Sequence, residues 1–298
     1  VTFTLPASAG TLVTSADVPI ITTATSNIGL GSSAVDSITT GDYNVGVGDN
    51  ALTSTTSGAY NAALGHSALG QNTASFNTGL GALAGSNITS GSHNTLVGAA
   101  AGDAITTGAN NTANGAYALT ENTTASNNTA MGYYALFANT TGHSNTSIGQ
   151  ASMDANTTGS YNTAFGRDSL GSNTTASNNT AYGYNTIASN TTGAGNTAMG
   201  VDALANSTTA SNNTAVGQSA MIANTTGSEN VAIGTFALKA NTTGVNNTSV
   251  GYWALGSNTT GQANSALGYG ALDSNTTGES NTAIGYFALS SQNNDSDN

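Results

Sequence analysis

The sequence predicts an all-β chain that forms a parallel β-solenoid with coils of 17 residues. Two observations predict this fold: a short motif that recurs at a constant spacing, and a composition of small residues with 38 glycines and only 5% charged residues. Ordinary domains carry about 25% charged residues. Low charge together with abundant small polar residues could also indicate disorder, but a disordered chain does not keep a fixed spacing over its whole length.

The repeat is defined by the motif Asn-Thr-Ala-apolar-Gly, whose asparagine is repeat position 1 below. The motif starts every 17 residues from Asn77 to Asn281. One 16-residue step leads back to Asn61, and Asn44 and Asn27 precede it, which makes 16 copies. Position 5 is glycine in every copy, positions 4 and 9 are mostly apolar, and position 12 is mostly the asparagine of an Asn-Thr-Thr-Gly stretch.

Each copy is too short for a helical hairpin and too rich in Asn, Thr and Gly for helix. We expect one coil per copy, with two strands of about five residues and two turns. Positions 2 to 6 would form one strand, and the Asn-Thr-Thr-Gly stretch would turn because Asn and Gly tolerate positive φ. Coils stacked at about 4.8 Å would make a rod about 75 Å long, with asparagine amides bonded in columns.

The chain divides into three parts. Residues 1–26 precede the repeat, hold both prolines, and are expected to form a cap or connector, since a bare solenoid end exposes unpaired backbone. Residues 27–290 are the predicted solenoid. Residues 291–298 are polar and acidic, and we expect a flexible tail.

The thin apolar content predicts association of several chains. One coil offers about two large apolar side chains, whose burial contributes roughly 3–6 kcal/mol. Ordering its residues costs about 25 kcal/mol. Side-by-side packing, in which one solenoid face becomes an interior, would make up part of the difference.

The consensus Asn-Thr-Ala-Ile-Gly-Tyr-x-Ala-Leu, as in 281–289, resembles the head repeats of YadA-like trimeric autotransporter adhesins. It is still more similar to the Asn-Thr-Thr-Gly repeats of bacteriophage tail fibres that carry an endosialidase-type chaperone. This resemblance covers about residues 27–290, and residues 1–22 resemble a connector found upstream of phage fibre shafts. It implies a homotrimeric, left-handed β-roll outside the cell or on a virion. The coil differs from the adhesin pattern in having 17 residues rather than about 14.

Charge and chemistry exclude several classes of function. The net charge is −12 and the basic residues are Arg167 and Lys239, which disfavours nucleic acid and anionic membranes as partners. No apolar run approaches the roughly 20 residues of a membrane span. The absence of cysteine excludes thiolate metal sites and thiol nucleophiles.

Candidate catalytic groups are sparse. His66, His93 and His143 occupy different columns on distant coils, so we expect no metal site. Asp168 and Asp202 share position 7 two coils apart, or about 10 Å. The two carboxyl groups of an inverting glycosidase lie about 6.5–9.5 Å apart, and one of them has a raised pKa. We therefore predict neither an enzyme nor a cofactor.

A column of aromatic residues at position 6 is the candidate binding site. It could stack sugar rings of a cell-surface polysaccharide or receptor, or it could pack along the stack and between chains. The column and its neighbour Trp253 comprise Tyr133, Tyr184, Tyr252, Trp253, Tyr269 and Tyr286.

Three functions fit the sequence. The first is a structural or adhesive rod of an extracellular or virion fibre that positions or provides a receptor-binding surface. The second is the adhesive head of a bacterial surface protein. The third is a self-assembling extracellular filament, glycosylated at its Asn-x-Thr triplets if the cell has the machinery.

Overall fold

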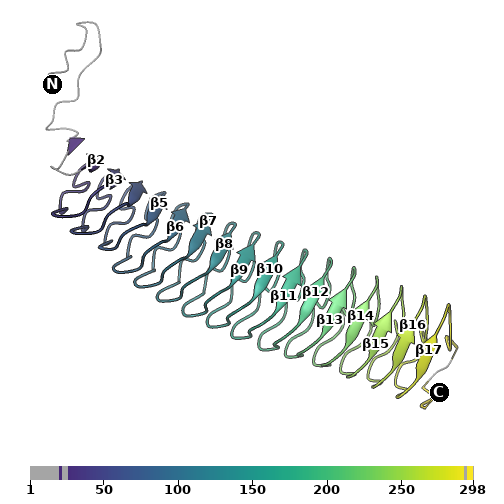
Figure 1. Ribbon diagram of the computed structural model, residues 1–298. Helices are drawn as coiled ribbons and strands as arrows, with labels where there is room; N and C mark the ends of the chain where they lie inside the picture. Colours follow the sequence, from purple (N-terminus) through teal and green to yellow (C-terminus); the bar gives the residue numbers. More distant parts are fainter. Residues whose placement is uncertain (1–19, 22–25, 292–293, 298) are drawn as a thin grey trace, which may run out of the picture.

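The structure is a computed structural model that describes residues 20–21, 26–291 and 294–297 of the chain. Its strands follow one another along a rod, with β2 near one end and β17 near the other (Figure 1). The predicted β-solenoid with a 17-residue coil is confirmed. The strands are β1 Ile20–Ile21, β2 Ile28–Leu30, β3 Val45–Val47, β4 Ala62–Leu64, β5 Thr78–Leu80, β6 Thr95–Val97, β7 Thr112–Asn114, β8 Thr129–Met131, β9 Thr146–Ile148, β10 Thr163–Phe165, β11 Thr180–Tyr182, β12 Thr197–Met199, β13 Thr214–Val216, β14 Val231–Ile233, β15 Thr248–Val250, β16 Ser265–Leu267 and β17 Thr282–Ile284.

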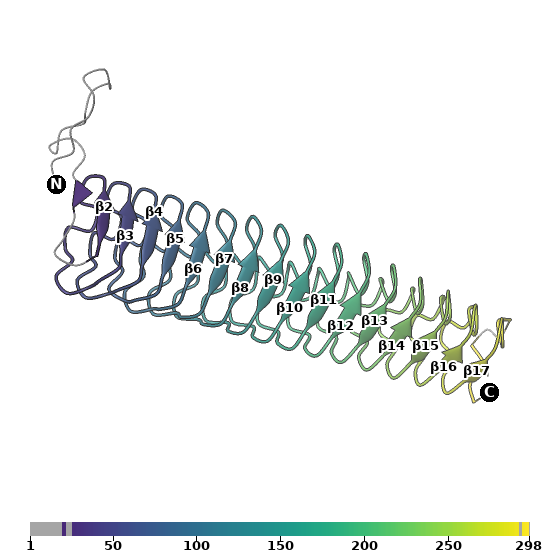
Figure 2. The ribbon, with the colours of Figure 1, turned by 45° about the horizontal axis from the view of Figure 1, so that its top comes forward.

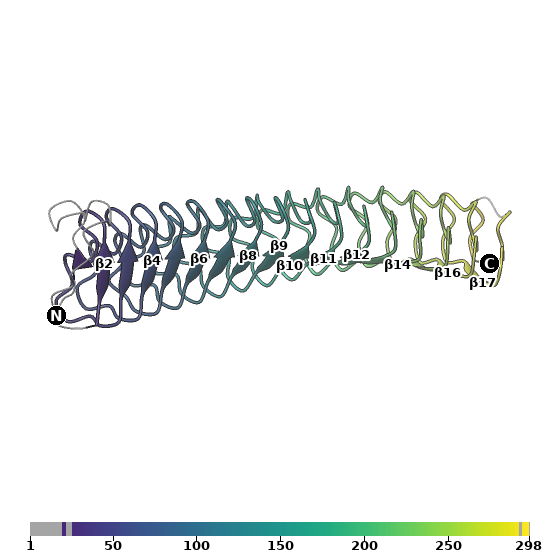
Figure 3. The same cartoon turned by 90° about the horizontal axis from the view of Figure 1, so that it is seen from above.

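The strands form one sheet along one side of the rod (Figures 2 and 3). From β2 to β17 each strand pairs in parallel with the next, and equivalent repeat positions lie opposite one another, as Thr163 does to Thr180. At the N-terminal end of the sheet, β1 pairs antiparallel with β2. The repeat period therefore sets the register of the sheet, because a shift of one residue would exchange its two faces.

The expectation of two five-residue strands per coil was wrong. Within the described residues, each coil contains one strand of three residues, at positions 2 to 4. The opposite side of the coil is joined to its neighbours without forming a strand. There the backbone N–H of the position-13 threonine donates to the position-13 carbonyl of the next coil, 2.8 Å from Thr157 to Thr174, and its hydroxyl donates to the same oxygen at 3.0 Å.

The strand is short because the backbone turns into positive φ around it. In the coil that begins at Asn128, φ is +139° at Gly132, +59° at Tyr134, +53° at Leu136 and +57° at Ser144, which are positions 5, 7, 9 and 17. No residue of the Asn-Thr-Thr-Gly stretch at 139–142 has positive φ, so the expected cause of that turn was also wrong. Its glycine is required for space instead: a Cβ on Gly142 would lie 2.3 Å from the Gly159 carbonyl oxygen.

The interior of the rod is built from positions 1, 3, 8, 9 and 12. Positions 3 and 8 are small and position 9 is a large apolar side chain, as in Ala164, Ser169 and Leu170, and all three of these residues are fully buried. Positions 2 and 4 point out of the sheet. Of the two large apolar side chains in a coil, one is therefore in the core and the other is on the surface.

The asparagines at position 1 form a continuous ladder inside the rod, as predicted. From Asn44 to Asn281 each backbone N–H donates to Oδ1 of the asparagine one coil earlier, at 2.8–3.0 Å. Each amide group also donates to the position-15 carbonyl of its own coil, as Asn145 does to Gly159 at 2.9 Å. These bonds satisfy the buried polar groups that would otherwise destabilise a narrow core.

A second ladder runs through position 12. It joins Asn122 to Asn190 and Asn224 to Asn275, with amide–carbonyl distances of 2.8–3.1 Å. Ser207 stands in the gap, fully buried, and its hydroxyl has no hydrogen-bond partner.

Two coils in the N-terminal third of the rod fill the core from other repeat positions than the rest. Position 9 is Gly85 or Gly102 there, and the missing side chain is replaced from position 12 by Ile88 and Ile105 and from position 3 by Leu96. A Cβ on Gly85 would lie 2.6 Å from a methyl carbon of Leu96, so the substituted side chains occupy the place of the usual leucine. The volume of the core is kept while the residues that fill it change.

The ends of the chain were predicted to be a connector and a tail. Most of residues 1–26 lies outside the described part. At the other end, Asp295 accepts a hydrogen bond from the Asn281 amide at 2.7 Å, and Asp297 donates to the Glu279 carbonyl at 3.0 Å. Residues 294–297 therefore lie on the preceding coil.

Candidate binding surfaces

The predicted aromatic column at position 6 is divided into three groups. Tyr133 lies among Tyr117, Tyr134 and Phe137, with its ring centroid 4.4 Å from that of Tyr134. Tyr184 stands alone with Arg167, whose guanidinium carbon is 5.8 Å from the ring centroid. Between these groups position 6 is occupied by residues such as Gln150 and Gln218, so the column is not continuous.

The largest group lies toward β17 and forms the C-terminal aromatic surface, which comprises Phe236, Tyr252, Trp253, Tyr269, Tyr286 and Phe287. Tyr252, Tyr269 and Tyr286 stack face to face with centroids 5.1 and 5.4 Å apart. The rings of Phe236 and Phe287 meet this stack edge-on. Stacking covers the ring faces between neighbouring tyrosines and leaves their edges and hydroxyl groups toward solvent. Tyr286, the last ring of the stack, is 76% exposed.

Both basic residues of the chain lie over aromatic rings. Lys239 Nζ is 4.9 Å from the Trp253 ring centroid and 5.0 Å from that of Phe236. Arg167 combines its contact with Tyr184 with a 3.0 Å ion pair to Asp168. Cation–π contacts of this kind contribute about 0.5–1 kcal/mol at exposed sites. Each positive charge of the chain therefore lies beside an aromatic ring on the surface.

Another aromatic stack, the N-terminal aromatic column at position 17, was not predicted from the sequence. It runs through Tyr43, Tyr60, Phe76 and His93, with centroids 4.9–5.1 Å apart and planes within 18° of one another. The column was hidden by the 16-residue coil, in which Phe76 is the sixteenth residue. That coil lacks position 14, because Ala74 supplies the carbonyl that position 15 supplies elsewhere. Aligning the sequence at both ends of the short coil would have revealed the column.

The outer face of the sheet carries a stripe of apolar side chains. Position 4 is apolar in every coil except at Asn114 and is exposed or half-buried along the rod, as in Leu64 (50%), Met199 (50%) and Ile284 (72%). Positions 2 and 4 contain no charged residue. Near β3 to β5 this face is hollowed into a groove of about 270 Å³ whose lining, from Val45 to Leu80, is almost entirely apolar. Single exposed apolar residues are ordinary, but a continuous patch indicates a contact surface.

Carboxyl groups gather at the turns near the middle of the rod. Asp154 and Asp168 line an open groove of about 620 Å³ together with Asn185, Ser172 and Ser189. Burial raises the pKa of Asp154, and the nearby carboxylate of Asp168 raises it further. Asn185 lies between the two candidate acids, donating to Asp202 Oδ1 at 2.6 Å, while Asp168 is paired with Arg167.

The three histidines remain apart from one another. His93 belongs to the N-terminal aromatic column, and the His143 ring meets that of Tyr161 edge-on at 4.9 Å. Across residues 20–21, 26–291 and 294–297, no three side chains of His, Cys, Asp or Glu are grouped as a metal ion would require. The same residues contain no helix that is long and apolar enough to span a bilayer.

Comparison with known proteins adds no relative to these observations. No protein-family model and no curated protein matches the chain.

Proposed function

We propose that this chain is a rod segment of an extracellular or virion fibre, in which several copies pack side by side and hold a binding surface away from its anchor. The observation that carries the proposal is the unbroken asparagine ladder, which joins each coil to the next from Asn27 to Asn281. Such an axial bond network suits a molecule whose task is to be long and stiff. The resemblance of the repeat to adhesin heads and phage tail fibres supports a place outside the cell.

The apolar stripe on the outer sheet face supports the association of copies. Position 4 supplies about half of the large apolar side chains of a coil, yet these lie outside the core. Covering them in an assembly would add the burial that one chain alone lacks. A homotrimer of left-handed rolls is the arrangement that the resemblance favours.

The molar mass of the purified chain in solution tests this proposal. Light scattering should give three chain masses, and electron microscopy should show rods of uniform length. A stable monomer would contradict the proposed assembly. Rods that join end to end would instead support the alternative of a self-assembling filament.

Direct adhesion is the second candidate, and the exposure of the C-terminal aromatic surface favours it. Tyr286 and Phe287 are exposed, as are Tyr252 and Tyr269. In this function the surface contacts a polysaccharide or receptor, as the head of a bacterial surface protein would. A glycan array with Tyr252→Ala and Tyr269→Ala variants tests it, with Tyr60→Ala as the matched control. Equal signals from all three variants and the parent would remove the surface from consideration.

A further inference from the structure

Asparagine-linked sugar is attached to the triplets Asn-x-Thr and Asn-x-Ser, and the triplets of this chain differ in how accessible they are. The reaction joins the side-chain amide nitrogen of the asparagine to a sugar, and the transferase also recognises the hydroxyl group two residues later. A folded acceptor therefore needs an exposed amide and a hydroxyl group that is not bound elsewhere. Each repeat position meets these two requirements to a different extent.

The most frequent triplet is Asn-Thr-Thr at positions 12 to 14, which occurs nine times between Asn122 and Asn275. Its asparagine belongs to the second ladder and is fully or almost fully buried in every copy. In Asn173 the amide nitrogen donates to Asn156 Oδ1 at 2.8 Å and to the Ala176 carbonyl at 3.0 Å. A transferase cannot reach this nitrogen unless the coil opens.

Three other kinds of triplet each fail one requirement. Position 1 begins an Asn-Thr-Ser triplet in two coils, and both asparagines are buried in the first ladder. Asn87 and Asn206, at position 11, are exposed, but the hydroxyl group two residues later donates to the next coil, as that of Thr208 does at 3.2 Å. In the last triplet, Oδ1 of Asn294 accepts from the Thr277 N–H at 3.0 Å.

The triplet Asn-Asn-Thr at positions 17, 1 and 2 meets both requirements. Its first asparagine is exposed in all five copies, and within the described residues its amide group makes no hydrogen bond. The threonine at position 2 points out of the sheet, and its hydroxyl group is also unbonded there. The middle asparagine is the buried residue of the first ladder, which anchors the triplet to the core. The five acceptors are Asn110, Asn127, Asn178, Asn212 and Asn246.

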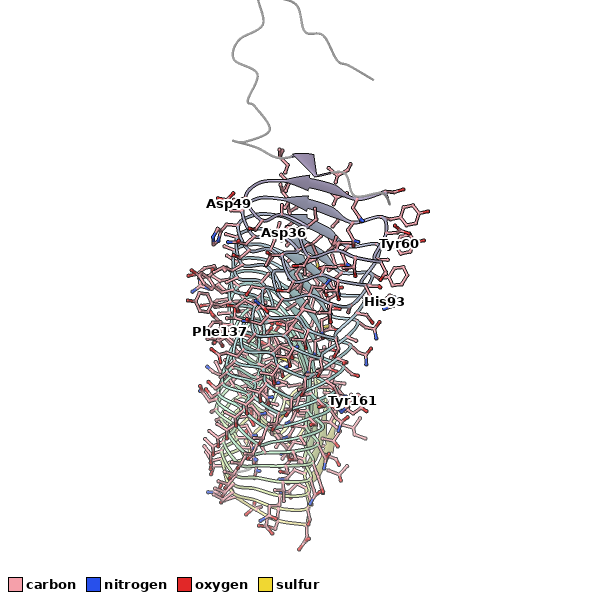
Figure 4. All side chains as sticks on the ribbon, turned by 90° about the vertical axis from the view of Figure 1, so that its left-hand side faces the viewer. Asp36, Asp49, Tyr60, His93, Phe137 and Tyr161 are labelled. Carbon is pink, nitrogen blue, oxygen red and sulfur yellow. The ribbon has the colours of Figure 1, made fainter. Side chains whose placement is uncertain are left out.

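The two accessible groups of this triplet lie close together on the surface. Positions 17 and 2 flank the buried asparagine, and two residues of extended chain span about 7 Å. Tyr60, His93 and Tyr161, which also occupy position 17, project from one side of the rod (Figure 4). The five asparagines continue this edge from the start of β7 to the start of β15, beside the apolar stripe of position 4.

The backbone does not require asparagine at position 17. From Tyr43 to Ser280 the residue at this position has a φ between +54° and +71°, whatever its type. Tyr161 (+59°) and Glu229 (+61°) adopt the same conformation as Asn178 (+62°). Because the asparagine side chain makes no hydrogen bond either, neither backbone strain nor a contact within the chain accounts for it. Its pairing with a free threonine hydroxyl points to modification.

We propose that the folded rod accepts asparagine-linked sugar at the five position-17 triplets and at none of the position-12 triplets. In the reaction Nδ2 loses a proton and forms a C–N bond with the anomeric carbon of the sugar. The phosphate group of the activated donor, a nucleotide sugar or a lipid-linked sugar, leaves with the electron pair of the broken C–O bond. This modification goes beyond the proposed rod function and does not depend on the number of chains in the assembly.

A soluble glucosyltransferase that acts on Asn-x-Thr triplets, with UDP-glucose as the donor, tests the proposal on the purified full chain. Peptide mass spectrometry then reports the hexose occupancy of each asparagine. We expect occupancy at Asn178 to exceed that at Asn173 at least tenfold, because Asn173 becomes accessible only in the fraction of molecules whose coil has opened.

A synthetic peptide of residues 170–182 is the matched control, because it contains both acceptors and lacks the fold. In the peptide, Asn173 and Asn178 should be modified to similar extents. Equal modification of both sites in the folded chain, or of neither while the peptide is modified at both, would overturn the proposal. A peptide modified only at Asn178 would also contradict it, because the sequence rather than burial would then select the site.

A second pair of variants tests the hydroxyl group. Thr180→Val removes the hydroxyl group of the Asn178 triplet and keeps a β-branched side chain, which suits an exposed strand position. Thr163→Val makes the same change in β10, where position 17 is Tyr161 and no triplet exists. We expect Thr180→Val to lower occupancy at Asn178 at least tenfold and to preserve it at Asn212, and Thr163→Val to change neither. Equal occupancy at Asn178 in the two variants would contradict the proposed acceptor.

Discussion

At the scale of single residues, the interior of the rod depends on amides that bond along its axis. Asn173 shows the full set: its amide donates to Asn156 Oδ1 at 2.8 Å and to the Ala176 carbonyl at 3.0 Å, and its own Oδ1 accepts from Asn190 at 2.9 Å. Ser207 occupies the same position without a partner for its hydroxyl. The gap divides the second ladder into two parts.

We predict that Ser207→Asn stabilises the protein by about 2–3 kcal/mol, because it supplies bonds to Asn190, Asn224 and Ala210, each with a net contribution of about 1 kcal/mol. The reciprocal variant Asn173→Ser should lose at least as much, because it opens a new gap. Thermal unfolding of both variants beside the parent measures this. A Ser207→Asn protein that unfolds below the parent would contradict the ladder as a source of stability.

The carboxyl group of Asp154 gives a pH dependence. Its pKa is raised by burial and by the neighbouring Asp168, so the folded state binds this proton more tightly than the unfolded state does. Its effect favours folding below the unfolded pKa of about 3.9, and stability is lost as the pH rises through the folded pKa. We expect Asp154→Asn to unfold at a higher temperature than the parent at pH 7 and at a similar temperature near pH 3.5.

Asp36 provides the control for this measurement. It occupies position 10, as Asp154 does, but it is exposed. Asp36→Asn removes the same charge from an exposed site, and its unfolding temperature at pH 7 should stay close to that of the parent. A parallel rise in both variants would indicate a general effect of net charge rather than burial of one carboxyl group.

At the scale of the coil, position 5 must be glycine for two separate reasons. Its φ lies near +130°, and the next coil passes directly against it: a Cβ on Gly166 would lie 2.3 Å from the Gly183 carbonyl oxygen. Gly285, in the coil of β17, has φ +129°, but its nearest neighbour is the Ala288 Cβ at 3.9 Å. The two sites separate backbone strain from crowding.

We predict that Gly285→Ala costs about 1–3 kcal/mol, the range for a residue held in an unfavourable backbone region. Gly166→Ala should cost about 4 kcal/mol or more, because the clash with the next coil is added to the same strain. Thermal unfolding and the fraction of soluble protein report the difference. Similar losses at both sites would mean that strain alone fixes the glycine.

The coil also shows what the sequence could and could not predict. The spacing of the motif predicted the period, the register and the asparagine ladder, because these follow directly from repetition. The number of strands could not be predicted, because Tyr134, Leu136 and Ser144 adopt positive φ that their residue types disfavour. Their backbone N–H groups donate to carbonyls of the neighbouring coils, Tyr134 to Ala116, Ser144 to Ser126 and Leu136 to Ser152, so bonds between coils hold this conformation.

Two features of the candidate surfaces had signals in the sequence. Position 3 is almost always small, whereas position 4 ranges in size from Val216 to Tyr182. A core position cannot vary so widely in volume, so this variation marks position 4 as the outer one. The interruption of the tyrosine column was also visible, at Gln150 and Gln218. The stacking of the rings on one another required the structure.

At the scale of the whole molecule, the apolar stripe gives a further test of association. Met199 lies in the middle of the stripe, and Thr192 is exposed at position 14, outside the sheet. We predict that Met199→Glu weakens association at least tenfold, because a carboxylate from each copy would be enclosed near the others. Thr192→Glu adds the same charge and should leave the molar mass unchanged.

Circular dichroism should show that both variants remain folded, since neither side chain is part of the core. An unchanged oligomer in Met199→Glu would show that the stripe is not the contact surface. Reduced mass in both variants would indicate that net charge, rather than the sheet face, controls association.

The coil of 61–76 has one residue fewer than the others, yet Asn61 and Asn77 still occupy the same ladder. Every coil bonds only to its two neighbours, so removal or duplication of a whole unit would recreate contacts of the same kind. Unequal recombination within the gene could therefore shorten or lengthen the shaft without passing through a misfolded intermediate. The length of the rod is then an easily inherited variable, set by copy number rather than by the fold.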